Sequence, residues 1–286
     1  MPLTIDQVPF LQARFGLGYH LPYLLQGETL IGLKDMKVLE VGGSLPRELV
    51  IDTLEADQWV GLEAMRYWEE LGETGGGTRP KTDLSIQINN VKNYSDIERY
   101  AVLEGLVENL PSCMEGSFDR VFSIACFEHI HTLGLALEKM HAALKPGGKL
   151  FTMFSPIWSA HDGHHLPIMN DVRGNKWSYS KSPIPPWAHL LLSPRQMEEH
   201  LCTRTDRKTA SEMIFNIYHN QHINRLFTEH YIEYVQQSPF RIEQLTATFQ
   251  TKIPENIQKS LEFRYPGKKH FSNNGLLMIL SKEPTF

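Results

Sequence analysis

Two short histidine-rich segments hold the side chains best suited to proton transfer or metal binding. Histidine exchanges protons near neutral pH, so either segment can supply a general base. The segments also combine imidazole nitrogens with carboxylate oxygens, which are donors that zinc and related metals use. FEHIH contributes Glu128, His129 and His131, and SPIWSAHDGHHLP contributes His161, Asp162, His164 and His165.

We expect at least one histidine among His161, His164, His165 and His129 to act as a base or substrate ligand. One alternative is that these are polar loop residues satisfied by hydrogen bonds, with the Glu-His pair capping a helix. Another is a metal site, for which His161, His165 and Glu128 are candidates. Their spacing matches no specific metal motif, so the prediction is that no metal is bound.

The elements that position these histidines are two buried strands. FDRVFSIAC (118–126) precedes the first segment, and KLFTMF (149–154) precedes the second. In an open parallel sheet, ligands bind beyond the carboxyl ends of the strands. Both segments are therefore expected to meet at that edge of the sheet.

The rest of the chain also alternates between strand and helix patterns, which predicts a parallel sheet with right-handed crossovers. We expect a Rossmann-like α/β fold with a seven-stranded, mostly parallel sheet, an antiparallel last strand and a lid or insertion after the fifth strand. Helices are expected over 45–54, from 133 to a stop at Pro146, and over about 194–237, and a loop over 72–83. The other predicted strands are 37–42, 58–64, a strand within 97–105, 240–250 and 275–282.

We divide the chain into four parts. Residues 1–36 form an N-terminal cap segment and 37–154 the cofactor-binding core. Residues 155–237 form a lid and helical insertion, and 238–286 supply the closing strands of the core. The aromatics of the insertion, Trp158, Trp177, Tyr179 and Trp187, suit a wall over the acceptor, a sugar-stacking face or a small satellite core.

VLEVGGS places Gly42 and Gly43 directly after the first strand, where side chains would obstruct a ligand. A dinucleotide site needs a further glycine at the start of the next helix, beneath the pyrophosphate. This chain has Leu45 and Pro46 there, so a ligand without phosphates fits better. S-adenosylmethionine is such a ligand: its ammonium group suits Glu40 near the turn, and its ribose diol suits Glu63 at the end of the second strand.

The order of these motifs resembles the class I S-adenosylmethionine-dependent methyltransferases. VLEVGGS resembles the family's first motif, VGLEAM its acidic-ended second strand, and LVENLPSCMEGSFDRVFSIACFEHI followed by MHAALKPGGKLFTMF its later core. The first motif usually carries one more glycine, near Leu45. An acidic residue often stands where this chain has Leu106. The resemblance implies that S-adenosyl-L-methionine is the cofactor and that it is held by Glu40, Gly42, Gly43, Ser44, Glu63, Ala64, Leu106, Val107, Ala125 and Cys126.

The expected function is methyl transfer to a small-molecule or sugar acceptor, at oxygen, with a histidine base. The net charge of −5 and pI near 6.2 argue against nucleic acid as a partner. No apolar run approaches the length of a membrane helix, the N-terminus is a poor signal peptide, and the three cysteines form no C-x-x-C pair, so we expect a cytoplasmic protein. A non-catalytic nucleoside-binding protein and a metal-assisted methyltransferase are the alternatives, and the oligomeric state stays open.

Overall fold

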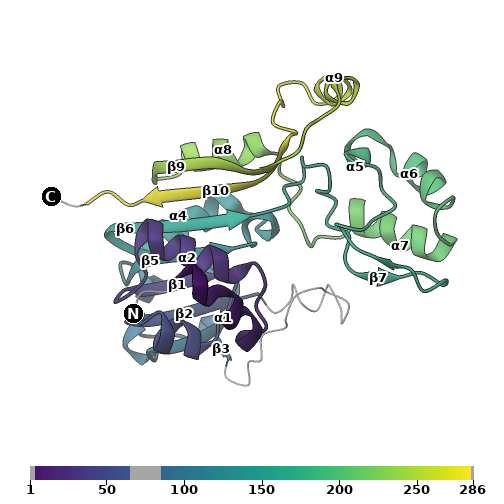
Figure 1. The fold of residues 1–286 in the computed structure, drawn as a ribbon. Coiled ribbons are helices and arrows are strands. Elements are labelled where there is room, and N and C mark those ends of the chain that lie inside the picture. The colour runs from purple at the N-terminus through teal and green to yellow at the C-terminus, as the bar shows by residue number, and fades with distance from the viewer. Residues whose placement is uncertain (1–3, 65–84, 285–286) are drawn as a thin grey trace.

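A computed structural model describes residues 4–64 and 85–284, and its centre is an eight-stranded sheet (Figure 1). The strand order is β3-β4-β2-β1-β5-β6-β10-β9. The predicted loop over 72–83 lies outside the described residues. The strands are β1 Lys37–Val41, β2 Gln58–Glu63, β3 Ser85–Gln87, β4 Tyr100–Glu104, β5 Phe118–Ile124, β6 Leu144–Phe154, β9 Arg241–Gln250 and β10 Asn273–Ser281.

Strand direction confirms the predicted fold class. β3, β4, β2, β1, β5 and β6 pair in parallel, while β10 is antiparallel to both β6 and β9. All seven predicted strands are present. The additional strand β3 is only three residues long, too short to show a sequence period.

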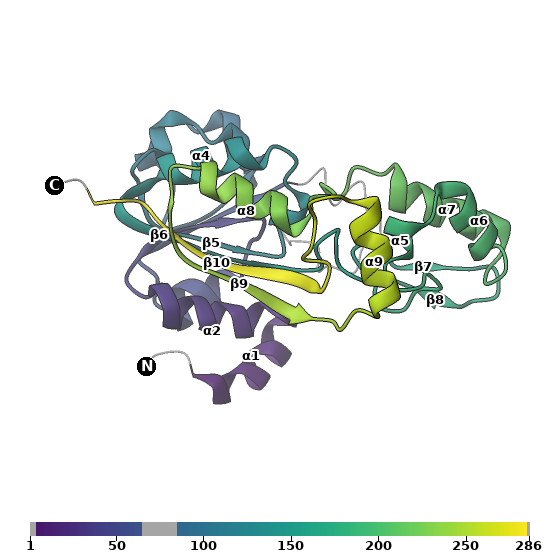
Figure 2. The same cartoon turned by 90° about the horizontal axis from the view of Figure 1, so that it is seen from above.

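Helices cover both faces of the sheet (Figure 2). Alternate residues of β1 point to opposite sides, so Leu39 and Val41 join one core cluster and Val38 joins the other. The first cluster includes α4 (Leu133–Ala143) and α8 (Thr228–Gln237). The second includes the N-terminal α1 (Val8–Phe15), α2 (His20–Ile31) and η2 (Glu48–Thr53). Short 3₁₀ turns complete the sheet unit at η1 Ile5–Gln7, η4 Ile88–Asn90, η5 Tyr94–Asp96, η6 Val107–Asn109, η7 Ser112–Met114 and η8 Phe127–His129.

Three predicted helical segments differ from the structure. Helix α4 ends at Ala143, and β6 already begins at Leu144 because that residue pairs with Phe118 of β5. The predicted helix over 45–54 is the single turn η2. The segment 194–237 divides into α6 (Pro194–Leu201), α7 (Arg207–Tyr218) and α8, since Asp206 caps a new helix through a hydrogen bond from the Thr209 amide.

An inserted lobe lies beyond the carboxyl ends of β5 and β6 (Figure 1). It contains the hairpin β7 (Met169–Asn170) and β8 (Lys176–Trp177), the short α5 (Ala188–Leu191), α6 and α7. The lobe has its own apolar cluster, whereas Tyr231 and Val235 of α8 belong to the cluster beneath the sheet. We therefore group α8 with the sheet and define the inserted lobe as residues 155–227.

One further helix, α9 (Glu255–Arg264), lies between β9 and β10, where the sequence predicted no helix. It packs against α5 of the inserted lobe through Leu261 and thus braces the lobe from the closing strands. Within the described ranges, none of the helices combines the length and hydropathy that a membrane crossing demands.

Two glycine substitutions test how closely α2 approaches the sheet. A Cβ at Gly27 of α2 would lie 2.8 Å from Cε2 of Phe122, whereas a Cβ at Gly134 of α4 would lie 3.5 Å from the Tyr234 ring. Gly27→Ala should therefore lower the free energy of unfolding by about 1–3 kcal/mol through overpacking. Gly134→Ala should be neutral or stabilising by up to ~1 kcal/mol, because alanine favours helix. Urea unfolding of both variants checks this, and a stabilising Gly27→Ala would contradict the packing.

Candidate functional site

The glycine turn, residues 42–45, leaves β1 and folds back over β2. Gly42 has φ 79° and donates its amide to Leu62 O at 2.9 Å, and Gly43 forms a bridge with Leu62. A Cβ at Gly42 would lie 2.2 Å from Sγ of Cys126. Gly61 of β2 leaves space for the same turn, because a Cβ there would lie 2.8 Å from the Gly43 carbonyl. The turn is thus packed between the ends of β2 and β5, and only glycine fits at Gly42.

Glu40 supports this turn from below. Its Oε2 accepts hydrogen bonds from the Leu45 amide at 2.9 Å and from Nε1 of Trp59 at 2.6 Å. Burial raises the pKa of Glu40 to about 7, and these two donors oppose the shift. A Cβ at Gly43 would lie 2.3 Å from Oε1 of Glu40, so the turn packs directly on this carboxyl group. The sequence pattern suggested that Glu40 meets a ligand, but its carboxylate is 4% exposed and holds the turn.

The charges at this edge of the sheet suit a cationic ligand. Carboxylates lie at or just beyond the carboxyl ends of β1, β2, β4 and β5, while the basic residue nearest the turn, Arg47, pairs with Asp52 at 3.1 Å. Such an edge disfavours a pyrophosphate and favours the sulfonium and ammonium of S-adenosylmethionine. The residues present therefore fit that cofactor. These acidic side chains are Glu63, Glu104 and Glu108, together with Glu40 and Glu128, whose pKa values burial raises to about 7 and about 8.

The other residues implicated by the resemblance lie along the same edge. Glu63 ends β2 and is buried, and Ala64 follows it. Leu106 and Val107 begin η6 directly after β4. Ala125, at φ 50°, and Cys126 follow β5, and Ser44 lies in the glycine turn. Since β4, β2, β1 and β5 are consecutive in the sheet, these positions form a single row.

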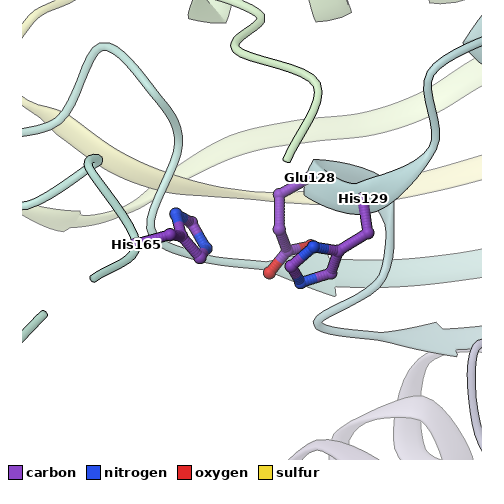
Figure 3. Close-up of side chains that lie close together, drawn as sticks. All are labelled: Glu128, His129 and His165. Carbon is purple, nitrogen blue, oxygen red and sulfur yellow. The ribbon is translucent and has the colours of Figure 1, made fainter. Parts of the chain in front are cut away.

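At the β5 end of this row, Glu128, His129 and His165 meet (Figure 3). Glu128 and His129 belong to η8, and His165 comes from the inserted lobe. One ligand atom from each side chain lies within 4.8 Å of the others. We call these residues the Glu128–His129–His165 cluster. The predicted meeting of the two histidine-rich segments is observed here.

Hydrogen bonds define which imidazole nitrogens carry protons. Nδ1 of His129 contacts the His222 carbonyl, and Nδ1 of His165 lies 3.2 Å from the Gly163 carbonyl. A carbonyl only accepts, so Nδ1 is the protonated nitrogen in both neutral rings. Nε2 of each ring therefore has a lone pair. This tautomer suits proton acceptance or metal ligation.

Burial sets the charge of the cluster. It raises the pKa of Glu128 to about 8, against the opposing effect of backbone amides of Glu128 and Ser155. It lowers the pKa of His129 to about 4, although the bond to His222 acts in the other direction. Burial, followed by the nearby His129 and His222, brings the pKa of His165 well below its usual range. Both imidazoles are thus neutral at pH 7.

The remaining predicted histidines lie outside this cluster. Nδ1 of His164 accepts the Leu166 amide at 3.2 Å, and its Nε2 lies 3.3 Å from Ser182 Oγ. His164 therefore has both nitrogens engaged within the inserted lobe. His161 lies near the start of β10, 3.4 Å from Thr251 Oγ1. Of the three predicted metal ligands, His165 and Glu128 lie together in the cluster. The third member of the cluster is His129 instead of the predicted His161.

Sequence patterns did not point to His222 and Asn224, which connect the two halves of the cluster. Nε2 of His222 donates to the His165 carbonyl at 3.0 Å. The Asn224 amide group donates to the carbonyls of Phe127 at 2.7 Å and Ile130 at 2.9 Å, on either side of the η8 turn. Both residues lie in 219–227, a break between α7 and α8 that was predicted to be helical. The polar run HNQHIN (219–224) lacks the apolar period of a helix, and this is the feature of the sequence that could have indicated the break.

Aromatic side chains approach the cluster from two directions. Tyr179 of the lobe stacks on His165 with ring centroids 6.4 Å apart and is about half-exposed. Tyr19, which precedes α2, stacks on His20 with ring centroids 4.2 Å apart, and its pKa is raised by burial and then by Glu128 and Tyr179. By contrast, Trp187 is buried and donates to the Phe271 carbonyl at 3.0 Å.

Glu40→Gln tests the buried carboxyl beneath the turn. Glutamine can keep one oxygen facing Leu45 and Trp59. The Glu40 pKa is raised on folding, so its stabilising effect is present below pH 4.5 and is lost as pH rises toward 7. Glu63 adds to that shift, and Tyr100 is the other titratable neighbour.

The variant should therefore gain stability relative to the parent between pH 5 and 8, by roughly 3 kcal/mol at most. Urea unfolding across this pH range measures the difference. Glu138→Gln, on the exposed face of α4, is the control and should show no such trend. A difference for Glu40→Gln that does not depend on pH would contradict the assigned burial.

Residues 68–152 match a family model described as a methyltransferase domain. No curated protein matches the chain significantly. Similar solved structures include an S-adenosylmethionine dependent methyltransferase from Mesorhizobium loti, with 14% identity, 94% of this chain and 100% of that chain covered, and a TM-score of 0.47.

A methyltransferase of Haloferax volcanii in complex with the activator Trm112 has 14% identity, coverage of 98% and 95%, and a TM-score of 0.46. A Thermotoga maritima protein named as a possible histamine N-methyltransferase has 16% identity, coverage of 97% and 94%, and a TM-score of 0.43. Similarities at this level say nothing about the acceptor. Residues 68–152, which contain β4, β5 and most of β6, therefore match a methyltransferase domain.

Proposed function

We propose that this chain transfers a methyl group from S-adenosylmethionine to a hydroxyl group of a small molecule or sugar, bound at the Glu128–His129–His165 cluster. The observation that carries the proposal is the pair of imidazoles whose Nδ1 atoms face carbonyls, so that each Nε2 has a lone pair. A hydroxyl must lose its proton to become a good nucleophile, and these nitrogens can accept it. His129 lies just past β5, beside the row of cofactor positions, and His165 comes from the inserted lobe.

The proposed cofactor contacts follow from the row at the sheet edge. S-adenosylmethionine, when bound, supplies a methyl group activated by a positively charged sulfur. Glu63 is assigned to the ribose diol, and the backbone of Leu106 and Val107 to the adenine. Gly42 allows the glycine turn to lie against Cys126, another residue assigned to the cofactor. The acidic side chains of this edge favour a cationic ligand.

The chemical step requires alignment of the acceptor oxygen with the methyl group and removal of the proton from that oxygen. His129 takes the acceptor proton at Nε2 while its Nδ1 stays bonded to the His222 carbonyl. The O–CH₃ bond forms as the CH₃–S bond breaks, and sulfur leaves as a neutral thioether. Holding the reactants in line can supply about 7–11 kcal/mol of the barrier reduction. Glu128 is buried and His165 is partly buried, which limits access of water to the acceptor oxygen.

The surroundings of the cluster support a small acceptor. Tyr179 presents a half-exposed ring beside His165, which suits an apolar or sugar-ring face. The acidic edge of the sheet opposes a nucleic-acid backbone. The inserted lobe, which contributes both His165 and Tyr179, is assigned the role of selecting the acceptor.

Gly42→Ala tests the cofactor position. The new Cβ would lie 2.2 Å from Cys126 Sγ, so the glycine turn has to move away from β5. The Kd for S-adenosylmethionine should rise at least about tenfold, equivalent to ~1.4 kcal/mol. Calorimetric titration of the folded variant measures it.

Gly147→Ala is the matched control. Gly147 has φ 77°, close to that of Gly42, but a Cβ there meets nothing within 4 Å. The control bears the same left-handed backbone strain of roughly 1–2 kcal/mol, while its Kd should stay within about twofold of the parent. Equal Kd values in the two variants would contradict the proposed cofactor position.

His129→Gln tests the proposed base. Removing the imidazole should lower kcat by about 10²–10⁴-fold with saturating S-adenosylmethionine, while the cofactor Kd changes little. Formation of S-adenosylhomocysteine with a panel of hydroxyl acceptors provides the measurement. His131→Gln, two residues away and exposed, should keep the parent rate.

Two outcomes would count against the proposal. Normal turnover by His129→Gln would remove His129 from the reaction. Tight cofactor binding by the parent with no product from any hydroxyl acceptor would instead favour another acceptor atom or a non-catalytic, nucleoside-binding role.

A further inference from the structure

We propose that Glu128, His129 and His165 form a binding site for one divalent transition-metal ion, with zinc as the reference ion. The family resemblance does not supply this site. It follows from the meeting of η8 with residue 165 of the inserted lobe, across 37 positions of sequence between Glu128 and His165.

The three side chains are already close, and both imidazoles have the tautomer that keeps a lone pair on Nε2. One atom from each side chain lies within 4.8 Å of the others, and Figure 3 shows the three groups directed toward a common space. Nδ1 of His129 and Nδ1 of His165 are bonded to carbonyls. Metal-ligating histidines almost always donate the other ring N–H to such an outer partner, which fixes the ring.

Glu128 gives a second, independent indication. Its Oε2 is buried, and no partner for it is found among the residues that the structure describes. A buried carboxyl oxygen without a partner is costly, because the interior does not replace its hydration. A cation between Oε2 and the two Nε2 atoms would remove that cost. Within the described ranges, no other group of three histidine, cysteine or acidic side chains has this proximity.

The ligand set indicates the class of ion. Two imidazoles and one carboxylate suit Zn²⁺, Fe²⁺, Co²⁺ or Ni²⁺, whereas Mg²⁺ and Ca²⁺ prefer all-oxygen sites. Structural zinc sites use four protein ligands, while catalytic sites use three and keep a position open. The three ligands here thus correspond to a site that can also bind an exogenous oxygen.

The catalytic role of the ion rests on the proposed function, whereas binding of the ion to the three side chains does not. In the loaded protein, the acceptor hydroxyl would bind to the ion, and its proton would pass to solvent. The resulting oxygen then forms the O–CH₃ bond as the CH₃–S bond breaks. His129 would serve as a ligand in this case, so chelation should abolish turnover; with His129 as a simple base, chelation leaves turnover unchanged.

The test is titration of the full chain with Zn²⁺ after chelator treatment, without S-adenosylmethionine or acceptor. Calorimetry should show one ion per chain. Glu128→Gln and His165→Gln should each weaken binding at least tenfold, equivalent to ~1.4 kcal/mol. His131→Gln is the matched control from the same FEHIH segment and should bind within twofold of the parent.

X-ray absorption of the zinc-loaded parent gives a readout that does not depend on the folding of variants. The expected first shell contains two imidazole nitrogens and oxygen. Absence of saturable binding, a shell without imidazole, or binding weakened only by His131→Gln would overturn the site. Because these measurements involve no methyl transfer, zinc binding with no turnover would reject the proposed function alone, and turnover without zinc binding would reject the metal site alone.

Discussion

The candidate site depends on one connection, the hydrogen bonds by which residues 220–224 join the inserted lobe to the sheet. The His222 carbonyl fixes the ring of His129, while the His222 ring holds the backbone of His165. Asn224 donates to the carbonyls on both sides of η8, and its own amide donates to the Glu128 carbonyl at 2.8 Å. Without this connection, an η8 turn and a lobe loop would have no fixed relation, and the three functional side chains would not converge.

A second constraint sets the cofactor half of the site. The glycine turn contacts Gly61 of β2, Cys126 after β5 and Glu40 of β1. The chain is therefore closely packed at this point. The missing third glycine is consistent with this packing, because the turn is held by Glu40 and by Leu62 rather than by a phosphate. The acidic edge that results is electrostatically opposite to a pyrophosphate site. The same part of the sheet edge therefore holds the glycine turn in place and favours a cationic ligand.

Burial links these two halves. The sheet edge and the lobe exclude water from Glu128, His129 and His165, which keeps both imidazoles neutral. The same burial leaves Glu128 Oε2 without a described partner. Buried titratable side chains without hydrogen-bond partners lower the stability of the fold. A proton, a substrate oxygen or a cation between them supplies the missing partner. The lobe thus contributes His165 to the cluster as well as a boundary to the site.

The sequence alone determined the parallel core, its closing antiparallel strand and the edge at which the histidine-rich segments meet, because hydrophobic period and glycine placement are local properties. It could also indicate Gly42 and Glu63 from their positions after strands. It did not determine that α4 gives way to a strand at Leu144, since the pairing with Phe118 overrides the helical pattern. Nor did it separate His165 from His164, neighbours of the same type whose rings have different partners. That choice, like the role of His222, depends on contacts between residues far apart in sequence, which only the tertiary structure creates.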